Sequence, residues 1–180
     1  MRRFHGTLLG VAAAAAAMIA SSALAHEPGF MTGGGSIMCA DSITGTTFRV
    51  THGFALYCRD DDGVQPVPNN LEINWGGNHF HLTSLTDLPG GDANPAFCSD
   101  NPSLSPVPPT APFDTFTGEG TGTYNGAPAT IKFTLTDGGE PGTRDSMAVT
   151  IVWEGNTVLS CPLTPLTYGN QQAHRLTGRR

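Results

Sequence analysis

Three carboxylates share a short glycine-containing loop in the last third of the chain. Asp137, Glu140 and Asp145 fall within nine residues, between two predicted strands. The glycines would let the backbone curl and turn carbonyl oxygens inward, and calcium binds oxygen ligands of this kind. The spacing differs from that of an EF-hand, and Arg144 could neutralise the acids instead. The loop is therefore either a calcium site or a hydrogen-bonded turn, of which the turn is the more common arrangement.

Histidines suggest a second chemistry, the binding of copper or another transition metal. His79 and His81 alternate along a predicted strand, so both side chains project from one face. Imidazoles in this position can share a metal ion if a third ligand reaches them. The simpler alternative is a polar stripe that faces solvent. His52 and His174 are candidate third ligands, although His52 lies on an apolar strand face, where a hydrogen-bonded core histidine is the more common case.

The N-terminal segment gives a further candidate ligand. Arg2 and Arg3 precede an apolar run over residues 8–20, and a small-residue cleavage pattern ends at Ala25. This is typical of a secretory signal peptide over residues 1–25, and no later segment is long and apolar enough to span a membrane. Cleavage there would expose His26, whose amine and imidazole could form a copper histidine brace with His79 or His81.

No motif for hydrolysis occurs in the chain. It contains neither a G-x-S-x-G elbow nor an H-E-x-x-H pair. Glu72 and Glu140 lack any spacing that would indicate a glycosidase pair. Trp75, Tyr57 and Trp153 could form a sugar-stacking surface, but both tryptophans share the strand parity of apolar residues, which favours core packing. We therefore expect no catalytic residues and no enzymatic activity.

The composition sets the class of fold that carries these residues. The 180 residues include 23 glycines and 14 prolines, and only 13% are charged. Both residue types disfavour long helices. Removal of residues 1–25 would change the net charge from −6 to −8, so the mature chain is a poor ligand for nucleic acid. We expect a secreted or periplasmic protein.

Alternating apolar residues predict the strands. The pattern is clearest over residues 47–58, 71–75, 79–83, 130–136 and 147–153, with turns at Gly76-Gly77 and at residues 154–156. Residues 89–112 carry seven prolines and predict a loop. Gly53 is a candidate bulge or bend in the first of these strands. Together these patterns predict one all-β domain over residues 26–180, an antiparallel β-sandwich or barrel of about eight strands.

Four cysteines follow the predicted signal peptide. Cys39, Cys58, Cys98 and Cys161 form an even set in a chain predicted to be exported, which indicates two disulfides. Three pairings are possible from the sequence alone. The cysteines lack the close spacing of a zinc site.

Several runs resemble a family of bacterial exported β-domains, the post-COAP type. Matching segments lie in order along almost the whole mature chain, at residues 31–37, 49–54, 68–75, 80–82, 97–100, 111–115, 120–126, 139–142 and 169–174, with Cys58 and Asp145. The resemblance implies a domain without an established activity. It also supports pairing Cys58 with Cys98, which leaves Cys39 to pair with Cys161. A basic residue is more usual at the position of His79, which is a departure from the family pattern.

These patterns predict a secreted, non-catalytic β-sandwich with a binding or structural role at the cell exterior. Its expected partner is an extracellular protein or a glycan, and not nucleic acid. The alternative is a small exported metal-binding protein. Its copper form would use His26, His79 and His81, and its calcium form would use Asp137, Glu140 and Asp145.

Overall fold

The computed structural model of the chain describes residues 29–40, 46–58, 69–86, 88–89, 96–101 and 111–175. The predicted signal peptide and His26 lie outside these residues. Within the described ranges there is no helix long and apolar enough to cross a membrane.

The described residues form ten β-strands in a single antiparallel sheet. The strands are β1 (Gly29–Ala40), β2 (Thr47–Tyr57), β3 (Asn70–Trp75), β4 (Asn78–Leu85), β5 (Ala96–Ser99), β6 (Thr115–Tyr124), β7 (Ala127–Thr136), β8 (Ser146–Trp153), β9 (Asn156–Pro165) and β10 (Tyr168–Arg175). Their order in the sheet is β10-β1-β2-β3-β4-β6-β7-β8-β9, and β5 also pairs with β6. The predicted all-β antiparallel fold is confirmed.

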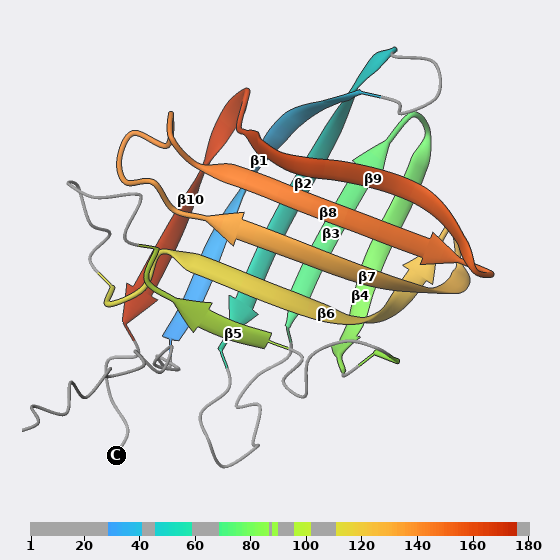
Figure 1. Cartoon of the computed structure of the whole chain (residues 1–180), viewed down its shortest axis with the longest axis horizontal. Coiled ribbons are helices and arrows are strands. Elements are labelled where there is room, and N and C mark those ends of the chain that lie inside the picture. The colour runs from blue at the N-terminus through green and yellow to red at the C-terminus, as the bar shows by residue number, and fades with distance from the viewer. Residues whose placement is uncertain are drawn as a thin grey trace, which may run out of the picture.

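The sheet curls over itself to make two layers, whose strands cross at a steep angle (Figure 1). The first layer contains β10 and β1–β4, and the second layer contains β5–β9. The sheet passes from one layer to the other where β4 pairs with β6, and the register of this pair shifts between Leu82 and Ser84. Strand irregularities of this kind bend a sheet at a corner.

Three two-residue turns close the hairpins β3–β4, β6–β7 and β8–β9. Both residues of each turn have a positive φ: Gly76 and Gly77, Asn125 and Gly126, and Glu154 and Gly155. Turns with this backbone match the twist of the strands they join. The predicted turns at residues 76–77 and 154–155 are therefore confirmed.

Apolar side chains from both layers fill the space between them. The largest fully buried ones are Phe80, Phe113, Phe116, Met31, Ile37, Leu56, Leu71, Ile73, Leu82, Ile131, Leu135 and Met147. Trp75 belongs to this core and stacks on Tyr124, while Trp153 packs against its rim. The prediction that both tryptophans serve packing is confirmed.

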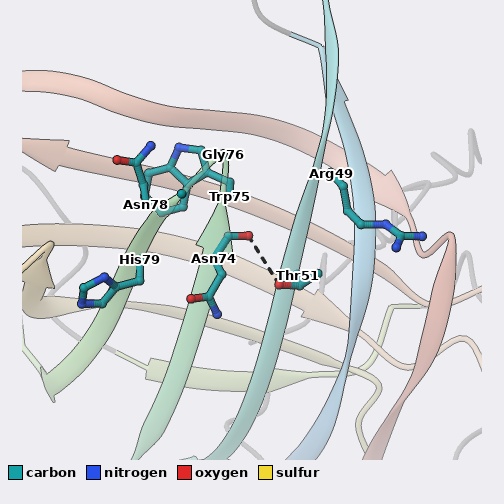
Figure 2. Close-up of a pocket in the computed structure, with 8 residues that line it drawn as sticks. Arg49, Thr51, Asn74, Trp75, Gly76, Asn78 and His79 are labelled. Carbon is teal, nitrogen blue, oxygen red and sulfur yellow. Dashed lines mark hydrogen bonds between the residues drawn. The ribbon is translucent and has the colours of Figure 1, made fainter.

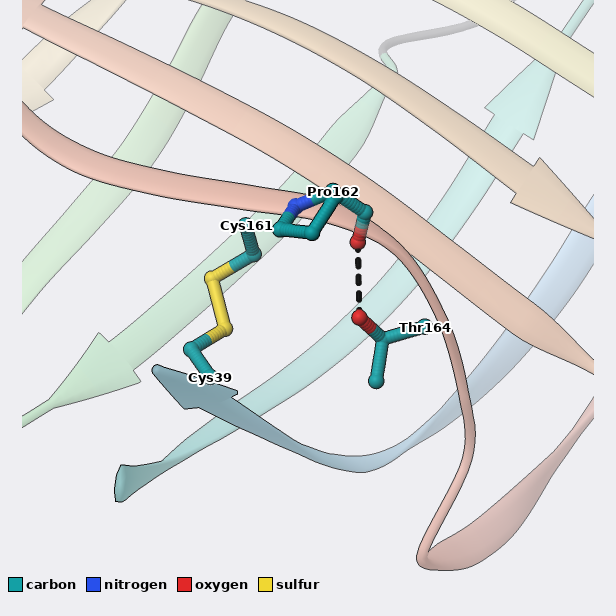
Figure 3. The surroundings of a disulfide bond; sticks show 4 residues. All are labelled: Cys39, Cys161, Pro162 and Thr164. Carbon is teal, nitrogen blue, oxygen red and sulfur yellow. Dashed lines mark hydrogen bonds between the residues drawn. A yellow bond between two sulfur atoms is a disulfide. The ribbon is translucent and has the colours of Figure 1, made fainter. Parts of the chain in front are cut away.

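Two disulfides fasten the curled sheet. Cys39 of β1 is bonded to Cys161 of β9, and Cys58, directly after β2, is bonded to Cys98 of β5. Figure 3 shows the first bond, next to a hydrogen bond from the Thr164 hydroxyl to the Pro162 carbonyl. Both disulfides therefore connect the first layer to the second, as the favoured pairing requires.

Two details of the sequence prediction were wrong. Residues 96–99 form β5 although they fall in the predicted loop over residues 89–112. Gly53 is no bulge, because β2 pairs with β1 and β3 in unbroken register at that position.

Candidate functional site

The loop that carries Asp137 and Asp145 is fastened to β10 by its own carboxylates. Asp145 is fully buried, and its two oxygens accept the backbone N–H groups of Gly138 (2.9 Å) and Gln171 (2.6 Å). Asp137 accepts the N–H groups of Gly139 and Ala173, each at 2.8 Å. Each carboxylate therefore joins the loop to the last strand.

Glu140 turns to another set of donors. Its Oε1 accepts the side-chain amides of Asn170 (3.0 Å) and Gln172 (2.5 Å) on the outer face of β10. The hydrogen bond from Gln172, and then that from Asn170, lowers the pKa of Glu140. The carboxylates of Asp137, Glu140 and Asp145 thus face protein donors instead of one common point.

This arrangement gives the predicted calcium site no support, and the site stays a prediction from the sequence. Across the described ranges no group of three or more His, Cys, Asp or Glu side chains is placed to hold a metal ion. The sequence placed the three acids close together, but backbone N–H groups from a strand about 30 residues later engage two of them. In the structure the loop is a turn held by hydrogen bonds from its own backbone and from β10.

The predicted histidine pair lies on one exposed face, as the strand parity requires. His79 and His81 both project outward from β4. His81 Nδ1 contacts the Glu72 carboxylate on the neighbouring strand, whereas His79 lies opposite Asn74. His174 Nε2 is hydrogen-bonded to the Thr32 hydroxyl at 2.8 Å. The structure does not bring these histidines together as a metal site, and the brace at His26 stays a prediction outside the described residues.

His52 is the buried histidine that the apolar strand face predicted. Its Nε2 lies 3.3 Å from the side-chain nitrogen of Gln171, whose Oε1 accepts the Thr136 N–H at 2.9 Å. Because this N–H must donate, the Gln171 amide nitrogen donates to His52 Nε2. The proton of the neutral ring then sits on Nδ1, which is buried without a partner among the described residues. Burial lowers the pKa of His52 to about 4.

Buried acids continue this polar network. Burial raises the pKa of Asp145, against the hydrogen bonds from Gln171 and Gly138 that lower it. Burial likewise raises the pKa of Asp114, whose carboxylate accepts the Thr115 hydroxyl at 2.6 Å and the Asn101 N–H. Asp114 and Asp145 are both buried, and their carboxylates accept hydrogen bonds from within the fold.

An open groove of about 400 Å³ lies on the exposed side of the first layer. Its lining is Arg49, Thr51, Asn74, Trp75, Gly76, Gly77, Asn78 and His79. Figure 2 shows Arg49, Thr51, Asn74 and His79 spread over the neighbouring strands β2, β3 and β4. The Thr51 hydroxyl donates to the Asn74 carbonyl at 3.5 Å. The groove therefore presents a guanidinium, an imidazole, amides and a hydroxyl.

The groove is built on a rigid support. Trp75 is only 7% exposed and stacks on Tyr124, with 5.6 Å between ring centroids. The Tyr124 hydroxyl donates to Asn78 Oδ1 at 3.0 Å, and the Asn125 amide donates to the same oxygen at 2.9 Å. These bonds fasten the β3–β4 turn to the β6–β7 turn.

Sequence reasoning missed the groove, although part of its signal was visible. Thr51, Asn74 and His79 each occupy the outward parity of a predicted strand. Their adjacency depends on the register, in which Thr51 pairs with Asn74 and Asn74 pairs with His79. A single sequence does not reveal that register.

Comparisons of the chain with protein-family models, with curated proteins and with solved structures found no match. The resemblance to the post-COAP type therefore stays a prediction from the sequence.

Proposed function

We propose that this protein is an exported, non-catalytic binding module that holds an extracellular glycan on the exposed side of its first layer. The observation that carries the proposal is the groove over β2, β3 and β4, where polar side chains stand on a sheet whose other side is core. Two disulfides are compatible with an oxidising compartment outside the cytoplasm. The predicted signal peptide supports the same location.

The chemistry of the groove favours a glycan over a protein partner. The cores of protein interfaces are enriched in aromatic and other apolar side chains. In the described part of the chain the exposed large hydrophobic residues are Met38, Leu163 and Tyr168. None of these belongs to the groove lining, and of the three only Met38 and Tyr168 lie beside it, next to Arg49. Amides, hydroxyls and a guanidinium are instead the partners that sugar hydroxyls require.

The shape of the groove suits a polymer. Gly76 and Gly77 form one side, and a Cβ added to either would meet nothing within 4 Å. A glycan chain could therefore pass over the turn and continue beyond it. A closed pocket would accept only a chain end or a single sugar.

Affinity electrophoresis against a panel of plant, fungal and bacterial polysaccharides tests this function. We expect retardation by at least one of them, and an affinity at least tenfold lower for Asn74→Ala, which removes a side-chain amide from the groove. Thr150→Ala is the matched control, because Thr150 is a half-buried residue of β8 in the second layer. Absence of retardation by the whole panel, or equal loss in both variants, contradicts the proposal.

A further inference from the structure

The charge of the groove points to a more specific ligand. The chain has 15 acidic and 9 basic residues, with a net charge of −6. The groove lining nevertheless contains Arg49 and His79 and no carboxylate. A cation in a groove without acids attracts an anionic ligand, and such charge complementarity selects the partner.

Arg49 is available to a ligand because no acid of the described chain neutralises it. The ion pairs within these ranges join His81 to Glu72 and Lys132 to Glu119. Glu72 is the acid next to Asn74 along β3, and its carboxylate is engaged by His81. The nearest acid in sequence to the groove is thus directed away from Arg49.

The position of Arg49 is set by an aromatic ring. Its guanidinium lies 5.3 Å from the ring centroid of Tyr168, the residue that begins β10. A guanidinium that stacks on a ring keeps its N–H groups in a planar fork that fits a carboxylate through two hydrogen bonds. Tyr168 is 67% exposed, so part of its surface remains open beside the charged group.

We propose that the groove binds a carboxylate-bearing polysaccharide, with the uronate carboxylate on Arg49 and sugar hydroxyls on Thr51, Asn74 and His79. This inference rests on the proposed glycan-binding function. The four residues belong to three neighbouring strands, which span roughly 10 Å at the usual strand spacing. The Arg49 side chain extends beyond this span, away from Asn74 and His79 (Figure 2) and toward Tyr168 of β10. The ligand therefore extends from the Arg49 guanidinium, on the β10 side, across β2 and β3 to His79 of β4, beside the open turn at Gly76 and Gly77.

Calorimetric titration of the full exported protein tests the ligand class. The probes are oligomers from polygalacturonate, alginate and a glucuronate-substituted xylan, each compared with its carboxyl-reduced counterpart. We expect at least tenfold tighter binding of one acidic oligomer than of its reduced form, and a preference that weakens as salt rises. Equal affinity for the acidic and reduced forms would overturn the inference.

Two variants of Arg49 separate the effect of its planar guanidinium from that of its charge. Arg49→Gln should abolish the preference for the acidic oligomer, and Arg49→Lys should restore only part of it because an ammonium lacks the planar fork. Arg175→Gln is the matched control, since it removes the same charge from the exposed end of β10 and should keep the full preference. A preference retained in Arg49→Gln contradicts the inference.

The outcomes for the two proposals differ. Binding of a neutral glycan that depends on Asn74 but not on Arg49 would leave the glycan-binding function standing and overturn the acidic ligand. Failure of every acidic and neutral glycan to bind would overturn both.

Discussion

His52 is the residue at which burial most clearly changes the chemistry of a side chain. It is 6% exposed, it accepts a hydrogen bond from Gln171, and its Nδ1 has no partner within the described residues. Burial lowers its pKa from 6.5 to about 4. In the unfolded chain the same ring would take up a proton near pH 6.5.

This difference predicts a loss of stability in acid. As the pH falls from 6.5 to about 4, the His52 ring binds a proton in the unfolded chain but stays neutral in the folded one. The free energy of unfolding therefore decreases. Above pH 6.5 the ring is neutral in both the folded and the unfolded chain, so its titration does not lower the free energy of unfolding. Below that pH the free energy of unfolding falls by about 1.4 kcal/mol per pH unit, and the decrease reaches about 3 kcal/mol at pH 4. The measurement is urea unfolding at pH 7, 6, 5 and 4, followed by tryptophan fluorescence.

The variant His52→Gln isolates this effect from the buried acids. Asp114 and Asp145 have raised pKa values, and they act in the opposite direction by favouring the folded state as they become protonated. Both proteins share that contribution, so it cancels in their difference. The stability of the wild type relative to His52→Gln should therefore decrease from pH 7 to pH 4. A constant difference would show that His52 does not titrate as its burial requires.

The sequence predicts the environment of some residues and not that of others. The alternation around His52 and Trp75 predicted their burial correctly, because strand parity is local information. The roles of Asp137 and Asp145 depend on the N–H groups of Ala173 and Gln171, which the fold brings to them from a distant strand. The sequence of the acidic loop therefore does not reveal these hydrogen-bond partners.

At the scale of the elements, glycines in β6 allow the sheet to fold into two layers. Gly118, Gly120 and Gly122 alternate along the buried face of the strand. A Cβ on Gly120 or Gly122 would collide with the Ser84 or His81 carbonyl of β4, and one on Gly118 would meet the Phe133 ring. The close approach of β4 to β6 at the corner therefore requires residues without side chains.

We expect Gly120→Ala to destabilise the protein by about 3 kcal/mol, the upper range for overpacking a core, because the collision is with rigid backbone. Gly53→Ala is the matched control, since an added Cβ there meets nothing within 4 Å. That change should leave stability equal or raise it by about 0.5 kcal/mol by reducing the freedom of the unfolded strand. Urea unfolding of both variants at pH 7 provides the comparison, and similar values for the two would refute this explanation of the corner.

The same glycines explain why some strands could not be predicted from the alternation of apolar residues. In β6 they replace the apolar residues whose alternation marks a strand, and in β10 the buried positions include Gln171. β5 has only four residues and lies in a proline-rich part of the sequence. It is held in the sheet by its pairing with β6 and by the disulfide of Cys98. The five strands whose alternation was visible have buried faces dominated by apolar side chains, and they are β2, β3, β4, β7 and β8.

For the whole molecule, the decisive feature is the seam where β9, at one end of the curled sheet, lies against β1, the strand next to the other end. β9 and β10 are at opposite ends of the strand order, yet they follow each other in the chain. The turn between them is held by hydrogen bonds from Leu166 N–H to the Asp145 carbonyl (2.8 Å) and from Thr167 N–H to the Ser36 carbonyl (2.7 Å). The Cys39–Cys161 disulfide connects β1 to β9 across this seam. The groove depends on the same closure, because Tyr168 of β10 positions Arg49 of β2.

Removal of the seam disulfide should weaken the molecule more than removal of the other one. Cys39 and Cys161 are 122 residues apart, whereas Cys58 and Cys98 are 40 apart. Loop-closure entropy gives upper values of about 5 and about 4 kcal/mol for the two bonds. We therefore expect the double variant Cys39→Ala/Cys161→Ala to lose about 1 kcal/mol more in urea unfolding than Cys58→Ala/Cys98→Ala.

Amide hydrogen exchange at pH 7 should also become faster in β9 and β10 while β3 and β4 keep their protection. The reason is that the disulfide fastens β9 to β1, and β10 is the end strand that pairs with β1. Uniformly faster exchange, or a larger loss for the Cys58–Cys98 pair, would mean that the seam is closed by packing and hydrogen bonds without help from the disulfide.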